Sequence, residues 1–276
     1  SSIMSKKLAS GADCILLDVK TGNGAFMKTL EDSIALAKAM VDIGEHNGRR
    51  TAALITDMDT PLGRNIGNSL EVIEAVETLR GKGPADLTEV CLSLASGMLW
   101  LAGRGGAAAC RAMAEDALRS GAALAKLRAM VAAQGGDPAV IDDPSGFPAA
   151  AYEQDVVCMQ DGWLYATDTE KIGIAAVLLG AGRETKESVI DPAAGIRLLK
   201  KAGDPVKKGD VLCIVESMKM FNNIEAELEG TIAELAARFD MTAEMIVAFI
   251  DGLNASLEEP FDMETLEDLY DIADTE

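Results

Sequence analysis

Residues 14–29 read CILLDVKTGNGAFMKT: an apolar run, then a glycine loop, then the approach to an amphipathic helix. The run over residues 14–19 is almost continuously apolar, which is typical of a strand buried on both faces of a parallel sheet. Apolar side chains then recur at helical spacing from Ile34 to Ile43, and Gly44 is the expected end of that helix. The stretch therefore predicts a strand–loop–helix unit of an α/β fold.

The chain up to residue 133 repeats this unit once and adds further helices. Its expected strands cover residues 14–19 and 51–56, a loop follows over residues 57–67, and its expected helices cover residues 2–10, 34–43, 70–79, 87–101 and 107–131. Strand–helix–strand spacing implies parallel strands joined by right-handed crossovers. Two strands are too few for a stable open sheet, so the parallel sheet is expected to be incomplete.

The rest of the chain predicts a linker over residues 134–152, a β-rich domain over residues 153–234 and a helical tail over residues 235–276. The expected strands of that domain are the segments VVCM, GWLYATD, AAVLL, GIRLLK, VLCIV and NIEAELEGTI. From Asp240 to Glu276 the sequence holds twelve carboxylates and no Lys or Arg. We interpret this tail as a solvated acidic segment, with a docking segment as the alternative.

The composition is that of a globular protein. Apolar residues make up 49% of the chain, which excludes a disordered protein, and no apolar run approaches the ~18 residues that a membrane span needs. The net charge of −20 and the lack of a basic stripe exclude a nucleic-acid partner. Five scattered cysteines without CxxC spacing favour reduced thiols, no metal site and a cytoplasmic location.

Four segments, in order, resemble the carboxyl-terminal part of pyrimidine-nucleoside (thymidine) phosphorylases. They are SSIMSKKLASGADCILLDVKTGNGAFMKT, TDMDTPLGRNIGNSLEV, QGGDPAVIDDPSGFP and IGIAAVLLGAGRETKESVIDPAAGIRLLKKAGDPVKKGD, covering roughly residues 1–210. The resemblance implies a pentosyltransferase of pyrimidine salvage that takes phosphate as co-substrate and requires no cofactor. It would convert uridine or thymidine into the free base and a pentose 1-phosphate.

The resemblance also implies a pyrimidine-base site at Ser2, Lys6 and Phe26. In the family, the serine and the first lysine of an S-x-x-x-K segment contact the pyrimidine ring, and an aromatic residue lines the pocket. The chemistry agrees, because negative charge builds on the pyrimidine carbonyls as the glycosidic bond breaks, and a cation and a hydroxyl stabilise it. Ser2 and Lys6 are four residues apart and so share one face of the expected helix. Without the resemblance, the pair would be interpreted as solvated surface.

The loop at Gly22 and Gly24 allows two interpretations. Backbone amides ahead of a helix can hold a phosphate, but the spacing is neither GxGxxG nor a P-loop. We favour a tight strand-to-helix turn that supports Phe26. Lys20 is expected to pair with Asp18 or another neighbour, and we assign it no catalytic role.

Three features of the family are not found in this sequence. They are the glycine-rich phosphate signature (SGRGLGHTGGT-like), the all-α domain through which the family forms homodimers, and the arginine that helps to hold the base. Because phosphorolysis depends on holding both substrates in line, we expect the purified chain to release no uracil or thymine when phosphate is added. Turnover like that of an intact phosphorylase would contradict this expectation.

A second resemblance begins near residue 205. The segment CIVESMKMFNNIEAELEGTIAE is similar to a biotin carboxyl carrier domain, whose modified lysine lies between two methionines, here at Lys219. The alternative is an unmodified carrier-like segment within a phosphorylase-type domain. Intact mass and a streptavidin blot, after co-expression with a biotin ligase, would separate the two.

Taken together, these patterns predict an α/β fold followed by an α+β domain with a lipoyl-like barrel-sandwich hairpin and the acidic tail. The expected function is pyrimidine-nucleoside phosphorolysis. The alternatives are a biotin carrier modified at Lys219, or a non-catalytic protein that binds pyrimidines through Ser2 and Lys6.

Overall fold

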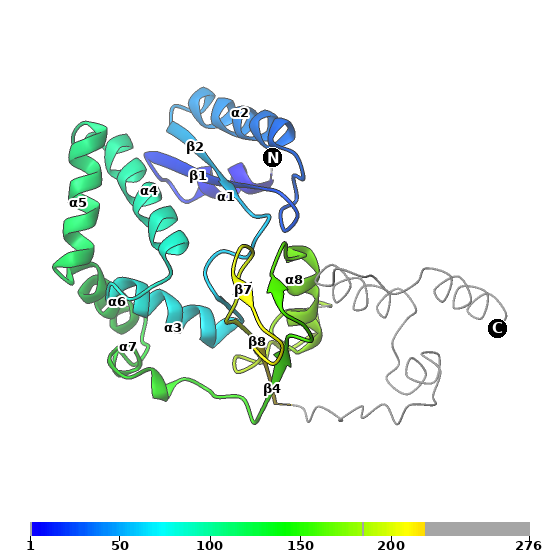
Figure 1. Cartoon of the computed structure of the whole chain (residues 1–276). Coiled ribbons are helices and arrows are strands. Elements are labelled where there is room, and N and C mark those ends of the chain that lie inside the picture. Colours follow the sequence, from blue (N-terminus) through cyan, green and yellow to red (C-terminus); the bar gives the residue numbers. More distant parts are fainter. Residues whose placement is uncertain (1, 184, 219–276) are drawn as a thin grey trace.

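Two parallel strands form the centre of the first part of the chain in the computed structural model, which describes residues 2–183 and 185–218 (Figure 1). Strand β1 (Cys14–Thr21) pairs in register with β2 (Arg50–Asp57), from Cys14 opposite Arg50 to Thr21 opposite Asp57. The strands expected at residues 14–19 and 51–56 are therefore confirmed. The sheet that these two strands form has no third member in the described part of the chain, as the prediction of an incomplete sheet required.

Helices cover both faces of this small sheet. On one face Ile15, Leu17 and Val19 pack against α1 (Ser2–Ala9) and α2 (Leu30–His46), which contribute Met4, Ala37 and Met40 to the same core. On the other face Leu16 meets Gly97 of α4 (Ala85–Leu101), where an added Cβ would lie 2.9 Å from Leu16 Cδ2. The alternation of side chains along a strand thus divides one apolar run between two helical layers.

Helix α2 runs past Gly44, the residue that was expected to end it. The chain instead reverses at Gly48, whose φ of +70° is left-handed and favours glycine. Gly44 is buried, and a side chain there would overlap Thr51 of β2. The prediction was wrong because this glycine lets the helix pass close to the strand instead of terminating it.

The helix expected over residues 107–131 is two helices, α5 (Ala107–Arg119) and α6 (Ala122–Ala133). Gly121, at φ +75°, breaks the run between them. Helix α3 (Asn68–Leu79) precedes α4, and the short helix α7 (Ala139–Asp142) and a 3₁₀ turn (Pro144–Gly146) lie in the expected linker. Arg80 holds this segment by donating to the carbonyls of Ile141 (2.8 Å) and Asp142 (2.7 Å).

A four-stranded antiparallel sheet forms the second part of the described chain, in the spatial order β3-β6-β8-β4. Its strands are β3 (Asn65–Ile66), β4 (Tyr152–Val157), β6 (Gly195–Leu198) and β8 (Val211–Ser217), and a separate pair is formed by β5 (Gly162–Trp163) and β7 (Pro205–Val206). Strand β3 comes from the segment expected to be a loop over residues 57–67. The first part of the chain therefore contributes a strand to the second sheet.

The segment AAVLL, expected to be a strand, belongs to helix α8 (Thr169–Leu178). Asp168 caps this helix by accepting a hydrogen bond from the backbone N of Lys171 at 3.1 Å. Ala176 packs with Ile196 and Leu198 of the sheet. The prediction failed because a short apolar run fits a buried helix as well as a strand.

The expected lipoyl-like barrel-sandwich is not seen in residues 2–183 and 185–218, where the strands form the open sheets given above. The expected strand NIEAELEGTI, Lys219 and the acidic tail lie outside the described residues. In the described part, no helix combines the length and the apolar character that crossing a membrane requires.

Candidate functional site

Helix α1 presents Ser2 and Lys6 to solvent while Met4 anchors it to the core. Met4 is 1% exposed and belongs to the core cluster beneath β1, whereas Ser2 and Lys6 are both exposed. The Oγ of Ser5 donates to the carbonyl of Ser2 at 2.9 Å, and the N of Ser10 donates to the carbonyl of Lys6 at 3.1 Å. The structure thus places Ser2 and Lys6 one turn apart on an anchored helix, and their contact with a pyrimidine stays a prediction.

Phe26 lies in the loop between β1 and α2 and is 93% exposed. The loop is tight, since Gly22 N donates to the Met27 carbonyl (3.1 Å) and Ala25 N donates to the Gly22 carbonyl (3.0 Å). Gly22 has φ +115°, and a Cβ there would lie 2.8 Å from the backbone N of Asp59. Only glycine fits at this position.

The backbone amides of this loop are already in use. Besides those of Gly22 and Ala25, Asn23 N donates to Asp59 Oδ1 at 2.8 Å and Gly24 N donates to the Met58 carbonyl at 2.9 Å. A phosphate cradle needs several amides that point outward without a partner. The structure therefore supports the strand-to-helix turn, in which the four successive amides of residues 22–25 already have acceptors.

A lysine network occupies the carboxyl end of the parallel strands. Lys20 Nζ lies 2.8 Å from Asp18 Oδ2 and donates to Thr56 Oγ1 at 2.9 Å, and Thr56 Oγ1 donates to Asp18 Oδ1 at 2.6 Å. The expected pairing of Lys20 with Asp18 is confirmed. Burial raises the pKa of the nearby Cys91 thiol above its usual value, so that thiol is protonated at neutral pH. The carboxyl ends of strands in open α/β sheets are where ligands bind, and the network keeps a cation fixed there.

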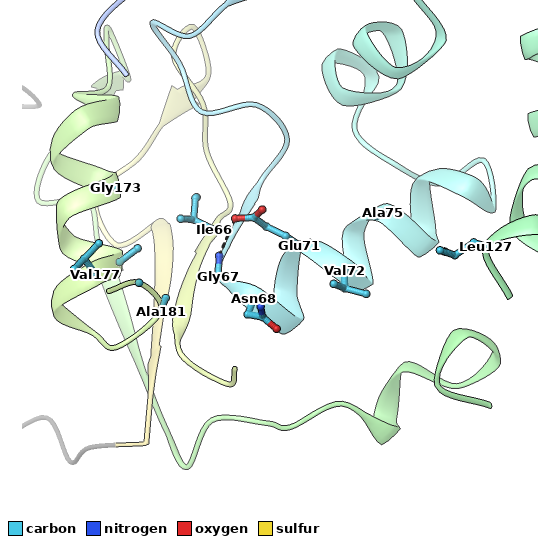
Figure 2. A pocket seen from close by; sticks show the side chains of 12 residues that line it. Ile66, Gly67, Asn68, Glu71, Val72, Ala75, Leu127, Gly173, Val177 and Ala181 are labelled. Atoms are coloured by element: carbon cyan, nitrogen blue, oxygen red, sulfur yellow. Dashed lines mark hydrogen bonds between the residues drawn. The ribbon is translucent and has the colours of Figure 1, made fainter. Parts of the chain in front are cut away.

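A groove of about 620 Å³ runs between α3, α6 and α8 (Figure 2). Its lining is mainly apolar and comprises Ile66, Gly67, Asn68, Glu71, Val72, Ala75, Leu127, Gly173, Ala176, Val177, Ala181 and Gly182. The one carboxylate, Glu71, accepts a hydrogen bond from the backbone N of Gly67 at 3.2 Å, drawn dashed in Figure 2. Neither Ser2, Lys6 nor Phe26 lines the groove, so it is not the base site that the sequence predicted.

Two carboxylates on α3 and α4, which sequence reasoning missed, hold the segment before β3. Glu74, 8% exposed, accepts from the backbone N of Arg64 at 2.9 Å and of Asn65 at 3.4 Å. Asp86 accepts from Gly63 N at 3.1 Å and forms an ion pair with Lys201 of the second part. The sequence carries no clear signal for Glu74, because its burial depends on the segment that folds back over α3.

These two carboxylates differ in pKa because their partners differ. Burial raises the pKa of Glu74 above its usual value, and the amides of Arg64 and Asn65 only partly oppose that effect. Burial is also the largest single effect on Asp86 and acts upward, but the hydrogen bond and charge of Lys201 and the amides of Leu87 and Gly63 together outweigh it, so the pKa of Asp86 is lowered. The cluster joins the two parts of the fold rather than presenting groups to a substrate.

Two family models match the chain. Residues 1–124 match the a/b domain of the glycosyl transferase family, and residues 163–236 match the pyrimidine nucleoside phosphorylase C-terminal domain. The second match runs through Lys219, so the segment that resembles a biotin carrier falls within a phosphorylase model. The comparisons give no support to a biotin carrier.

Curated proteins of high similarity carry the same name. The pyrimidine-nucleoside phosphorylase of Geobacillus stearothermophilus is 54% identical over 218 residues, covering 79% of this chain and 50% of that protein. Those of Bacillus subtilis (strain 168) and Staphylococcus haemolyticus are 49% and 48% identical over 245 residues, covering 85% of this chain and 57% of each relative. The chain therefore spans about half the length of the curated relatives it matches.

Proposed function

Because this chain belongs to the pyrimidine-nucleoside phosphorylase family, we propose that it supplies the pyrimidine-binding side of a pentosyltransferase cleft. The reaction transfers the pentose of a pyrimidine nucleoside from the base to phosphate, giving a free pyrimidine and a pentose 1-phosphate. Helix α1 carries the proposal, because it presents Ser2 and Lys6 on an exposed turn and fixes that turn through the buried Met4.

The proposed chemistry concerns the leaving base. As phosphate attacks the anomeric carbon, the glycosidic C–N bond breaks and its electron pair passes to the ring nitrogen and the carbonyl oxygens of the pyrimidine. The Lys6 ammonium and the Ser2 hydroxyl donate hydrogen bonds to a carbonyl on which this charge collects. Donors that are already in place stabilise developing charge without reorganisation. Phe26 offers an apolar ring face to the base. We assign no residue of this chain to the phosphate.

The proposal includes further properties of the whole enzyme. Phosphate is the co-substrate, no cofactor is required, and the working assembly is a homodimer, as the family resemblance implies. A cytoplasmic location is supported by the five cysteines, which all lie in the described part of the chain and are all unpaired with one another.

Replacing Lys6 by methionine should weaken binding of uracil and thymine about tenfold, because the lost hydrogen bond is charge-assisted. The measurement is calorimetric titration of the 276-residue chain with each base. Lys7→Met is the matched control, since Lys7 is also exposed on α1 but points about 100° away around the helix. Ser2→Ala should show a smaller loss than Lys6→Met.

Two results would overturn the proposed base site. One is an unaltered chain that binds neither uracil nor thymine at millimolar concentration. The other is a Lys6→Met variant whose affinity equals that of Lys7→Met.

A further inference from the structure

The amino-terminal end of helix α8 meets the glycine loop that carries Phe26, as the close approach of the top of α8 to the β1–α2 loop in Figure 1 shows. Thr169, only 6% exposed, donates from Oγ1 to the carbonyl of Asp59 at 2.7 Å. The backbone N of Glu170 donates to Asn23 Oδ1 at 2.9 Å. Residues 110 and 147 positions apart along the chain therefore bond to each other here.

Asn23 is the centre of this contact, because three of its polar groups are bonded. Its backbone N donates to Asp59 Oδ1 (2.8 Å), its carbonyl accepts from Lys28 Nζ (2.6 Å), and its side chain accepts from the N of Glu170. Lys28 forms a second link to α8, since the Nζ that donates to the Asn23 carbonyl also lies 2.7 Å from Glu170 Oε2. The loop, the segment after β2 and the start of α8 are thus joined through one side chain.

The loop and helix α8 are also closely packed against each other at Gly24. A Cβ added at Gly24 would overlap the Cγ2 methyl of Thr169 and would lie 3.0 Å from the Met58 carbonyl. The loop can approach α8 only because residue 24 has no side chain. Thr169 therefore contacts the loop through its methyl group and the neighbouring segment through its hydroxyl.

The loop has little else to fix its position. Phe26 is 93% exposed and Lys28 is exposed as well, and Ala25 is among the few buried side chains of the turn. A segment with so little apolar burial of its own depends on hydrogen bonds to hold one conformation. Those bonds come from α8 and from the segment at Met58 and Asp59.

We infer that the start of α8 is a latch that fixes the loop carrying Phe26, so that the second part of the chain sets the geometry of the pyrimidine pocket. Asn23 and Thr169 are its positioning residues and do not touch the base. If the loop is already ordered before the base binds, binding loses less conformational entropy and the affinity is higher. This inference rests on the proposed function, since it gives Phe26 its role at the base.

The test compares Asn23→Ala and Thr169→Val with the unaltered 276-residue chain. Thr169→Val keeps the shape and removes only the hydroxyl. Asn47→Ala and Thr185→Val are matched controls, because each removes a local hydrogen bond at an exposed site away from α8's first turn. Thr169→Ser, which keeps the Oγ donor, shows whether the hydroxyl carries the effect, and Asn23→Ala still tests the latch if Thr169→Val folds poorly.

Two readouts are needed. Amide hydrogen exchange over residues 22–28 should become about fivefold faster in Asn23→Ala and Thr169→Val, the change expected for one lost hydrogen bond. Calorimetry with thymine or uracil should show affinity weakened by about the same factor. The controls should match the unaltered chain in both, and Thr169→Ser, which keeps the hydroxyl but loses the methyl contact, should lie closer to it than Thr169→Val does.

The outcomes distinguish the two proposals. Unchanged exchange over residues 22–28 in both variants would refute the latch. Faster exchange with unchanged pyrimidine affinity would refute its role in positioning the pocket. If the unaltered chain binds no pyrimidine, the proposed function fails, while the exchange data still decide whether the latch exists.

Discussion

Gly195→Ala should lower the free energy of unfolding by about 3 kcal/mol, because overpacking between two fixed backbones has no inexpensive relief. Gly195 begins β6, and a Cβ there would overlap the Ile66 carbonyl and lie 2.7 Å from Leu70 Cδ1 and 3.2 Å from Gly67 Cα. Neither chain can retreat easily, since Ile66 pairs with Ile196 and Ser69 N donates to the Pro192 carbonyl at 3.0 Å.

Urea unfolding followed by circular dichroism measures the effect. Gly162→Ala is the matched control, because Gly162 also lies in a strand but an added Cβ there meets nothing within 4 Å. The control should change stability by less than about 1 kcal/mol, the usual range for glycine replaced at an unstrained site. A Gly195→Ala variant as stable as this control would show that the β3–β6 contact is looser than the structure describes.

Glu74→Ala should destabilise the protein by about 3 kcal/mol, because two backbone amides lose the acceptor that they share in a buried site. The carboxylate satisfies Arg64 N and Asn65 N, immediately before and at the start of β3. Alanine fills neither the volume nor the hydrogen bonds. The pKa of Glu74 is raised because burial disfavours its charged form. The side chain therefore contributes to stability through the hydrogen bonds that it accepts rather than through its charge.

Glu74→Gln separates bonding from charge in the same assay. Glutamine keeps one acceptor oxygen at nearly the same place, so its loss of stability should lie below that of Glu74→Ala. Glu115→Ala serves as the control, since Glu115 is exposed and its ion pair with Arg111 is of the surface type, which contributes at most about 1 kcal/mol. Equal losses for Glu74→Ala and Glu115→Ala would contradict the role of Glu74.

Much of the first part of the fold follows from local pattern. The strands at residues 14–19 and 51–56 were expected from continuous apolar runs, and helices α1, α3 and α4 from their periodicity. These elements are decided by residues within a few positions of one another. Local preferences of this kind are realised in the folded protein when the tertiary contacts favour the same conformation.

Two glycines show where local pattern stops being sufficient. Gly44 looks like a helix end but lies inside α2, where its lack of a side chain admits Thr51. Gly121 looks like a tolerated helix residue but breaks the run between α5 and α6 at φ +75°. Glycine is used both for left-handed backbone and for close approach, and the choice between these uses depends on what lies opposite it in space.

By itself, the sequence determined the strand–loop–helix unit at residues 14–29 and indicated the family, and it supplied the residues of the proposed base site. Only the tertiary structure decided that residues 65–66 form a strand against β6, that Glu74 turns inward, and that α8 holds the loop of Phe26 through Asn23. The physical reason is how far a local sequence pattern can report contacts. Periodicity reports contacts between near neighbours in a regular element. The β3–β6 pairing and the bond between Asn23 and Glu170 instead join residues more than a hundred positions apart, and Glu74 bonds to a segment outside its own helix. All three depend on how the chain closes in space.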